Sequence, residues 1–271
     1  MFAGRHLLAL LGVVALAGAA ATPAAAAVPT KRPGVLMVGL SMPVPNFQFG
    51  VVLGSEVVVA EGLEIDLIEA VARRLGIPQV EYVNETGFLP IIDGRPKPYD
   101  LAIAEATITP ERARRIDYSI PYLRADQGVL MARQYRSAAP RTLAEVRRLR
   151  LCSGRGTTGA AAIRQHVRPL QPPLLLENQR RVFDALRRGR CAAAVYDAPI
   201  LAAVKAAQPR AYGKLIGRIP TDERYGIVFE QGSPLRRHVN AALRELIASR
   251  TVQAIRDRWL GSSAAALPVL R

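Results

Sequence analysis

The sequence predicts an α/β protein in which strands and helices alternate along most of the chain. Three observations lead to this expectation. Half of the 271 residues (50%) are hydrophobic and 22% are charged, as in globular proteins with a substantial core. Short apolar runs of strand length are separated by longer segments with helical periodicity. Such alternation is typical of parallel sheets, in which each strand returns to the sheet through a helix.

The chain begins with a segment that has the features of a secretory signal peptide. Arg5 precedes an apolar run over residues 7–17, and Ala25 and Ala27 form a small-residue cleavage pattern. The run is short for a membrane span, which needs roughly 20 apolar residues. We expect cleavage near Ala27 and a periplasmic location. No cysteine lies at the cleavage site, so we expect no lipid anchor there.

Four apolar runs in the first half of the chain have the length and composition of buried strands, and one longer segment has the periodicity of a helix. The expected strands cover residues 35–39, 80–84, 100–104 and 128–132. Leu63, Leu67, Val71 and Leu75 recur every four residues, so they share one face of the expected helix. Gly76 follows this face and predicts the end of the helix.

The second half of the chain repeats the alternation. Thr142 and Glu145 have the spacing of a capping box, in which each side chain accepts a hydrogen bond from a free backbone N–H group at a helix start. Asn178 and Gly189 predict the start and the end of a later helix. Further strands are expected at residues 149–153, 191–195 and 225–229, and further helices from Thr158 and at 197–207, 233–249 and 251–260. We expect the C-terminal tail to be frayed.

Cys152 and Cys191 are the only cysteines, and each falls in an expected strand. Thiols oxidise in the compartments to which exported proteins are sent, and neighbouring strands of one sheet bring two such side chains close together. We therefore predict a disulfide. On the chain-entropy model, closing this loop contributes roughly 4 kcal/mol of stability. The alternative is a pair of buried, unreacted thiols.

The formal net charge is +15, of which the expected signal peptide contributes one. A strongly basic chain favours nucleic acid or anionic lipid as a partner. However, the arginines are dispersed among acids and leucines, and no aromatic RNA-binding pattern or Cys/His finger spacing accompanies them. We interpret most of the charge as solvated helix faces and expect no nucleic-acid partner.

Polar residues follow the expected strand at 100–104, in the stretch ATITPER. In open α/β sheets, ligands bind outside the carboxyl ends of the strands. Thr107 and Thr109 offer hydroxyl groups and backbone donors there, and Pro110 favours a short helix. Arg112 adds a planar guanidinium group that fits a carboxylate with two parallel hydrogen bonds. The stretch therefore predicts a carboxylate-binding site.

Two other strand ends complete the predicted site. After the strand at 149–153, the glycines of GRGTTG allow close backbone approach, and the N–H groups of Thr157 and Thr158 begin a helix, which favours an anion. After the strand at 191–195, Asp197 offers a carboxylate to an ammonium group. An arginine, threonines and an aspartate at separate strand ends predict the binding of an α-amino acid.

Each of these features also has a simpler interpretation, because short motifs carry a risk of false matches. Arg112 is then one more surface arginine, Asp197 caps the helix that follows it, and GTTG is a tight turn.

Together, and in this order, the motifs resemble those of the extracellular solute-binding proteins of family 3, the polar amino-acid receptors of ABC importers. The matching segments span most of residues 35–260 and are GLEIDLIEAVARRLG, ATITPERARRIDYSIPYL, GTTG, GRCAAAVYDAPIL and YGIVFEQGSPLRRHVNAALREL, ending in RDRWL. The resemblance implies a two-lobed periplasmic binding protein of type II. Each lobe is then a sheet flanked by helices, and two hinge strands join the lobes. Cys152 and Cys191 lie where several members carry a disulfide.

The resemblance also implies a division of the chain and a role for each site residue. The expected parts are a signal peptide at 1–27, a first lobe at 28–132 and 231–262, a second lobe at 133–230, and a tail at 263–271. Arg112 and Thr107 are expected to hold the α-carboxylate of the ligand together with the backbone amide of Thr158. Asp197 is expected to hold the α-amino group.

The sequence departs from the family pattern where the ligand side chain is expected. Val44 and Glu85 stand where many members carry an aromatic residue, and Glu105 replaces a small residue beside Thr107. Two acids near the site repel an anionic ligand, so we expect a cationic side chain or a basic amine instead. The alternative is that both acids face solvent or pair with neighbouring arginines.

Three functions remain compatible with the sequence. The first is a monomeric receptor that delivers an amino acid to an ABC transporter permease in the inner membrane. The second is an enzyme on the same scaffold, resembling cyclohexadienyl dehydratases, in which Glu85 or Glu105 is a general acid. The third is a binding module that serves a sensor or a dehydrogenase. We expect the first, with no catalytic residue, metal or cofactor, since no pattern for other catalysis is present.

Overall fold

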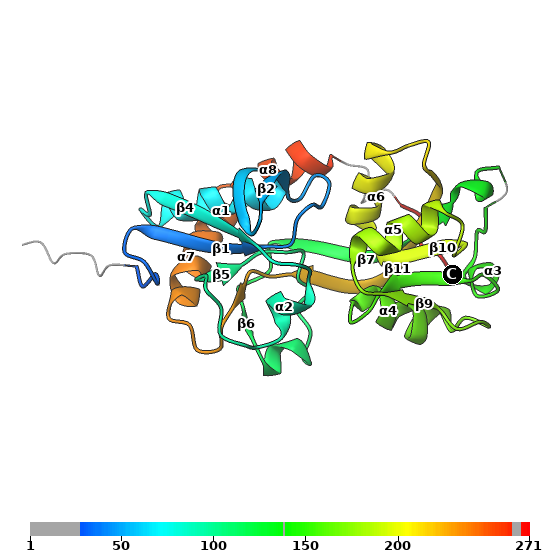
Figure 1. The fold of residues 1–271 in the computed structure, drawn as a ribbon, viewed down its shortest axis with the longest axis horizontal. Coiled ribbons are helices and arrows are strands. Elements are labelled where there is room, and N and C mark those ends of the chain that lie inside the picture. Colours follow the sequence, from blue (N-terminus) through cyan, green and yellow to red (C-terminus); the bar gives the residue numbers. More distant parts are fainter. Residues whose placement is uncertain (1–27, 138, 262–266) are drawn as a thin grey trace, which may run out of the picture.

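A computed structural model describes residues 28–137, 139–261 and 267–271 of the chain. Two α/β lobes lie along one long axis (Figure 1), which confirms the predicted fold class. The expected signal peptide lies outside the described residues. Within the described ranges, no helix is both long enough and apolar enough to cross a membrane.

The first lobe is built on a seven-stranded sheet with β1 near its centre. The strands follow the order β2 (Phe49–Leu53), β3 (Glu56–Glu61), β4 (Gln79–Asn84), β1 (Val35–Leu40), β5 (Leu101–Ala102), β12 (Val228–Phe229) and β6 (Asp117–Tyr118). β1 pairs in parallel with both β4 and β5. Because parallel strands end at the same edge of a sheet, the loops that follow these three strands lie together.

Helices cover the faces of this sheet. They are α1 (Leu63–Arg74), α2 (Leu89–Ile92), the 3-10 turn η1 (Arg112–Arg114), α7 (Leu235–Ala248) and α8 (Thr251–Leu260). The expected apolar face of α1 is buried at Leu63, Leu67 and Val71. α1 packs against α7 and α8, so the C-terminal helices return to the lobe in which the chain begins.

The second lobe is built on a five-stranded sheet. Its strands follow the order β11 (Tyr212–Tyr225), β7 (Leu123–Ala132), β10 (Ala193–Asp197), β8 (Leu151–Gly154) and β9 (Leu174–Leu176). Its helices are η2 (Arg133–Tyr135), α3 (Leu143–Val146), α4 (Thr158–Ala162), the π-helical turn η3 (Ile163–Val167), α5 (Gln179–Arg187) and α6 (Ala198–Ala207). The capping box of Thr142 and Glu145 is confirmed, as is the Asn178 cap of α5.

Two long strands connect the lobes. β7 and β11 run antiparallel, from Leu123 opposite Tyr225 to Ala132 opposite Tyr212, and extend from the first lobe into the second (Figure 1). The two sheets therefore divide between β6 and β7 on the outward path and between β11 and β12 on the return. We refer to residues 28–122 and 226–261 as the first lobe and to 123–225 as the second lobe.

Two expected strands are divided or shortened in the structure, and one observed hairpin was not expected. The run at 225–229 was predicted as one strand, but β11 ends at Tyr225 and β12 begins at Val228. The strand expected at 100–104 contains only β5, because the backbone turns at Glu105 with a positive φ of 46°. The hairpin of β2 and β3 was not predicted, since its apolar side chains are largely exposed and do not alternate cleanly.

The end of the tail is ordered, which corrects the expectation of a frayed tail. Val269 forms a parallel bridge with Arg218 of β11, and the Leu270 side chain is only 3% exposed in the core of the second lobe. The carbonyl of Arg271 accepts a hydrogen bond from the Leu143 amide at the start of α3. Residues 267–271 thus dock on the second lobe (Figure 1).

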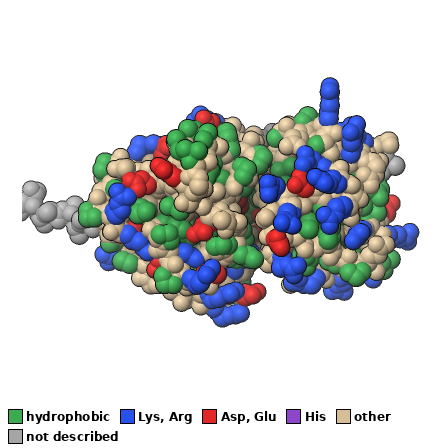
Figure 2. Space-filling view, in the orientation of Figure 1, with side chains coloured by type: hydrophobic (Ala, Val, Ile, Leu, Met, Phe, Trp, Pro, Cys, Tyr) green, Lys and Arg blue, Asp and Glu red, His purple; other side chains and the backbone are tan. Residues whose placement is uncertain are grey.

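The net positive charge is carried by the second lobe. The second lobe contains 20 arginine or lysine residues and 7 aspartate or glutamate residues, a formal net charge of +13. The first lobe contains 15 of each kind and is formally neutral. Figure 2 shows the blue side chains gathered over the second lobe, whereas both signs mix over the first.

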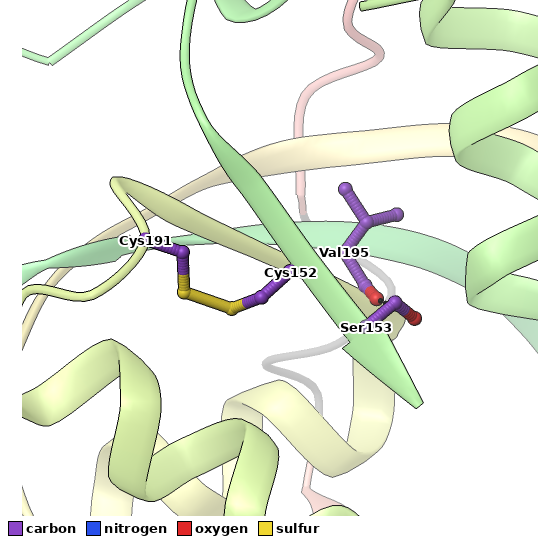
Figure 3. Close-up of a disulfide and its surroundings, with 4 residues drawn as sticks. All are labelled: Cys152, Ser153, Cys191 and Val195. Carbon is purple, nitrogen blue, oxygen red and sulfur yellow. Dashed lines mark hydrogen bonds between the residues drawn. A yellow bond between two sulfur atoms is a disulfide. The ribbon is translucent and has the colours of Figure 1, made fainter. Parts of the chain in front are cut away.

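The predicted disulfide joins Cys152 of β8 to Cys191, two residues before β10 (Figure 3). β8 and β10 are parallel neighbours, and the two Cα atoms are 5.8 Å apart. Ser153, next to Cys152, donates a hydrogen bond from its hydroxyl to the Val195 carbonyl at 2.8 Å. Both cysteines are buried, so the bridge lies within the core beneath the site.

Candidate functional site

A cavity of about 350 Å³ lies where the two lobes face each other. This volume falls within the range of about 300 to 1,000 Å³ that is usual for small-molecule sites. The first lobe contributes the loops that follow β1, β4 and β5, and the second lobe contributes the loops that follow β8, β9 and β10. The cavity therefore lies at the carboxyl ends of strands from both sheets, as predicted for open α/β sheets.

The structure brings seven of the eight predicted ligand-binding residues to this cavity: Glu85, Glu105, Thr107, Arg112, Thr157, Thr158 and Asp197. The eighth, Thr109, is not part of the cavity wall. Its hydroxyl oxygen accepts a hydrogen bond from the Arg112 amide at 3.2 Å and so begins the turn η1. Thr109 positions Arg112, and the role of the other seven as ligand contacts stays a prediction.

Arg112 is a buried guanidinium group, only 6% exposed, and not a surface arginine. Nη1 donates to the Thr107 carbonyl at 2.9 Å, and Nη2 donates to the Gly156 carbonyl of the second lobe at 3.2 Å. The guanidinium carbon lies 4.9 Å from the centre of the Phe88 ring, at cation–π distance. These contacts fix the plane of the group at the cavity wall.

Arg112 has no carboxylate within salt-bridge distance among the described residues. Its side chain pairs instead with carbonyl oxygens and an aromatic ring. A buried charge is costly unless it is paired with an opposite charge. The site is therefore suited to an anionic group that enters the cavity.

The threonines near Arg112 have defined hydrogen bonds. The Thr107 hydroxyl donates to Glu223 Oε2 of β11 at 2.9 Å. Thr157 caps α4, since its hydroxyl oxygen accepts from the Ala160 amide. Thr158 is the first residue of α4, where the backbone N–H has no acceptor within the helix. Its amide is thus available to an anion beside Arg112.

Asp197 ends β10 and is 6% exposed. It does not cap α6 with its side chain. Instead, Oδ1 accepts from Gln127 Nε2 at 2.5 Å, and Oδ2 accepts from the Tyr225 hydroxyl at 2.5 Å. Burial, followed by the nearby Glu223 carboxylate, raises the pKa of Asp197 to about 7. An ammonium group beside Asp197 favours the carboxylate form.

Glu105 is 8% exposed, and it neither faces solvent nor pairs with an arginine, so that alternative is wrong for this residue. Its Oε1 atom has no hydrogen-bond partner among the described residues. Its backbone amide donates to Glu64 Oε1 at 2.8 Å. Burial, followed by the Glu64 and Asp197 carboxyl groups, raises the pKa of Glu105 well above its usual value.

The cavity wall contains more acidic than basic side chains. The acids are Glu85, Glu105, Glu177 and Asp197, and the bases are Arg112, Arg155 and Arg180. Glu85 is half-buried near Tyr99, and burial followed by the Glu85 carboxylate raises the pKa of the Tyr99 phenol. Arg155 and Arg180 are exposed, so the enclosed part of the cavity is acidic except at Arg112.

Sequence reasoning missed three residues that organise the site. Phe88 stacks on Arg112, Gln127 bridges Thr158 and Asp197, and Glu64 contacts Glu105. Phe88 could have been identified from the sequence, because it is an aromatic residue in the segment NETGFLP. Glu64 had a weaker signal, as an acid next to the apolar face of α1.

The comparisons with known proteins agree with this geometry. The model of the family described as bacterial extracellular solute-binding proteins, family 3, matches residues 36–262. The chain is 27% identical over 205 residues to the ABC transporter glutamine-binding protein of Bacillus subtilis, covering 74% of this chain and 72% of that protein. It is 26% identical over 235 residues to the L-cystine-binding protein of Escherichia coli, covering 86% and 85%.

Two solved structures are similar over most of the chain. One is an ancestral arginine-binding protein bound to glutamine, with a TM-score of 0.71, 28% identity, and coverage of 85% of this chain and 99% of that one. The other is an ancestral amino acid-binding protein described as a precursor of cyclohexadienyl dehydratase. Its TM-score is 0.69, with 26% identity and coverage of 84% and 95%.

Proposed function

The chain belongs to family 3 of the bacterial extracellular solute-binding proteins, and from this premise we propose that it is a receptor for an α-amino acid. The relatives named above bind glutamine, cystine or arginine. The proposal states what the cavity of this chain holds and which residues hold it.

The observation that carries the proposal is the buried charge of Arg112, which has no salt-bridge partner among the described residues. A ligand α-carboxylate facing its guanidinium group accepts two parallel hydrogen bonds and neutralises the charge. The backbone amides of Thr107 and Thr158 lie at the same cavity wall and supply further donors. Asp197 supplies the opposite charge for the α-ammonium group. The two charged groups of an amino acid thus meet complementary partners.

The acidic wall favours a cationic ligand side chain. Glu105 and Glu85 lie on the first-lobe side of the cavity, away from the arginines Arg155 and Arg180 of the second lobe. A carboxylate side chain would face like charges there, whereas an ammonium or guanidinium group would face opposite ones. We therefore infer that arginine, ornithine or lysine fits better than glutamate.

The family also supports a location and a partner. Its members are extracellular solute-binding proteins, and the signal peptide expected before Ala27 is consistent with export to the periplasm. We infer that the loaded receptor delivers its ligand to an ABC transporter permease in the inner membrane and acts as a monomer.

The proposal is tested by replacing Arg112 with alanine. Leaving a ligand carboxylate unpaired in the closed cavity costs about 2 to 5 kcal/mol, which corresponds to a loss of affinity of about thirtyfold to several thousandfold. Lysine restores only part of this, because a point charge does not form two parallel hydrogen bonds. Affinity is measured by calorimetry with a panel of amino acids that begins with L-arginine.

Arg114 provides the matched control. It lies in the same turn but is exposed, so Arg114→Ala is expected to bind like the wild type. Circular dichroism establishes that each variant is folded. If Arg112→Ala binds amino acids as tightly as Arg114→Ala, the receptor proposal is wrong and only the fold remains.

An enzyme on this scaffold is the competing function, and Glu105 is the residue that favours it. A buried carboxyl that retains its proton near neutral pH has the property required of a general acid. Incubation with arogenate or prephenate separates the two functions. If the wild type forms product and Glu105→Gln does not, the protein is a dehydratase and the receptor proposal is wrong.

A further inference from the structure

Glu105 in the cavity wall and Glu64 behind it form a pair of buried acids. Glu64 lies in the first turn of α1 and is 0% exposed, and Glu105 follows β5 and is 8% exposed. The two residues are joined by the hydrogen bond from the Glu105 amide to Glu64 Oε1. The backbone of Glu105 has a positive φ of 46°, a conformation that side chains other than glycine seldom adopt. The local backbone is thus arranged to bring these two residues together.

The two members of the pair have different surroundings. Glu64 accepts hydrogen bonds from the Gln48 side-chain amide, the Tyr122 hydroxyl and the Glu105 amide. Three donors favour the charged form of a carboxyl group. Glu105 has no such set of donors, and its Oε1 atom lacks a partner. Of the two, Glu64 is better suited to the negative charge and Glu105 to the proton.

The groups that face Glu105 from other elements are acids and phenols. They are Glu64 of α1, Asp197 and Tyr196 of β10, Tyr225 of β11, and Tyr122 before β7. Arg112, the buried cation of the cavity, acts on Asp197 and Tyr196 instead. Two buried carboxylates in contact without a cation repel each other strongly, so the empty pair retains at least one proton. Burial raises the pKa of Glu64 to about 7, in keeping with this arrangement.

We propose that the Glu64–Glu105 pair exchanges its proton for the cationic side chain of a bound amino acid. In the empty protein the proton is held on Glu105. When an ammonium or guanidinium group reaches Glu105, the O–H bond of the carboxyl breaks, the proton passes to solvent, and the carboxylate pairs with the ligand cation. A neutral amide side chain instead donates a hydrogen bond to the protonated carboxyl group, and the proton stays on Glu105.

This exchange makes ligand preference depend on pH. Below the pKa of the pair, a cationic ligand must displace the proton, and its affinity rises by up to about tenfold for each pH unit. A neutral ligand displaces nothing from the pair. Both ligands place an α-ammonium group beside Asp197, so the contribution of that residue cancels when they are compared. The inference rests on the proposed function as an amino-acid receptor. It adds the means by which the receptor selects the side chain of its ligand.

The test compares the binding of L-arginine and L-glutamine by calorimetry between about pH 5.5 and about pH 8.5. Each titration is repeated in two buffers of different ionisation enthalpy. The buffer difference measures the number of protons released on binding. We expect arginine to release more protons than glutamine, and the affinity ratio of arginine to glutamine to rise with pH. In Glu105→Gln both differences are expected to disappear.

Glu61→Gln is the matched control, since Glu61 is an exposed acid of the first lobe outside the cavity. It is expected to keep the wild-type differences. If the two ligands release equal numbers of protons in wild type and their affinities change in parallel with pH, the proton exchange is wrong. The receptor proposal then still stands. Failure of every amino acid to bind, at any pH, overturns the receptor proposal and the exchange with it.

A second measurement needs no ligand. A carboxyl whose folded pKa is raised takes up a proton on folding, so its contribution to stability is lost as pH rises from the unfolded pKa towards the folded one. Glu105→Gln removes this loss. The substitution is therefore expected to raise the melting temperature more at about pH 8 than at about pH 5. If the change in melting temperature is the same at both pH values, Glu105 does not hold a proton in the folded protein.

Discussion

Arg112 and Asp197 are buried residues of opposite charge in the cavity wall. Arg112 is held by neutral carbonyl oxygens, and Asp197 is held by the neutral donors Gln127 and Tyr225. Neutral partners orient each side chain without cancelling its charge. Each group thus remains available to a ligand group of opposite sign.

Asp197→Asn is expected to weaken amino-acid binding in a pH-dependent way. Because burial raises the pKa of Asp197 to about 7, the wild-type residue is largely protonated at pH values about one unit lower and an approaching α-ammonium group must expel that proton. The loss caused by Asp197→Asn is therefore expected to be large above this pKa and smaller below it. Calorimetry on each side of the pKa measures both losses.

Asp184→Asn serves as the control for this prediction, since Asp184 is a half-buried residue of α5 outside the cavity that pairs with Arg187. A loss for Asp197→Asn that is the same at both pH values would contradict an ionising role for Asp197. It would leave Asp197 as a hydrogen-bond acceptor only.

The sequence predicted the charged residues of the site better than the residues that orient them. Arg112 and Asp197 follow expected strands, so the position of each in the chain places it at a strand end. Gln127 and Glu64 reach the site from elements distant in the sequence, and their partners are separated by 70 and 41 residues. No local pattern reports such contacts, because they arise only when the strands and helices of each lobe are assembled.

At the level of elements, buried apolar runs and caps were readily predicted. The strands that became β1, β8 and β10 are short and buried, so their apolar runs identify them, and β4 was predicted as well although it is only half-buried. β2 and β3 were missed because their apolar side chains are largely exposed and do not alternate cleanly with polar ones. The shortness of β5 was also missed, since only the tertiary contact with Glu64 explains the turn at Glu105.

The disulfide between β8 and the start of β10 gives a prediction at this scale. Reduction opens a loop with a sequence separation of 39 and is expected to lower the free energy of unfolding by roughly 4 kcal/mol on the chain-entropy model. The oxidised protein is expected to show no free thiol after unfolding without reductant. Denaturant unfolding with and without reductant measures the stability, and thiol titration measures the redox state.

The variant Cys152→Ala/Cys191→Ala is the control, because reductant has no bond to break in it. Its stability is expected to be the same under both conditions and close to that of the reduced wild type. Two titratable thiols in protein prepared from an oxidising compartment would show that the bridge does not form there.

For the whole molecule, the two-lobed arrangement followed from the resemblance to a known family, whereas the course of the tail did not. Residues 267–271 read LPVLR, a short segment with a proline, for which the sequence predicted no helix or strand. The structure instead uses the edge strand β11 as a template, and the bridge between Val269 and Arg218 covers part of that edge. Docking depends on a strand edge that local sequence does not reveal.

Leu270→Ala tests whether the docked tail stabilises the protein. Leu270 is 3% exposed, and removing a buried leucine side chain costs about 2 to 5 kcal/mol when the cavity does not collapse. Val269 is 38% exposed and gives the matched control, Val269→Ala, with little expected effect. Denaturant unfolding measures both, and hydrogen exchange at residues 215–219 reports whether the edge of β11 opens. Equal effects of the two substitutions would argue against a docked tail.

The uneven charge of the two lobes has a consequence for how the molecule moves. A formally neutral lobe and a lobe of charge +13 lie at opposite ends of one axis, so the centre of charge is displaced from the centre of mass. Such a molecule has a large electric dipole along its length and experiences a torque in any external field. Near a negatively charged surface it rotates until the second lobe points towards that surface. In physiological salt this alignment is confined to distances of the order of the Debye length, about 8 Å.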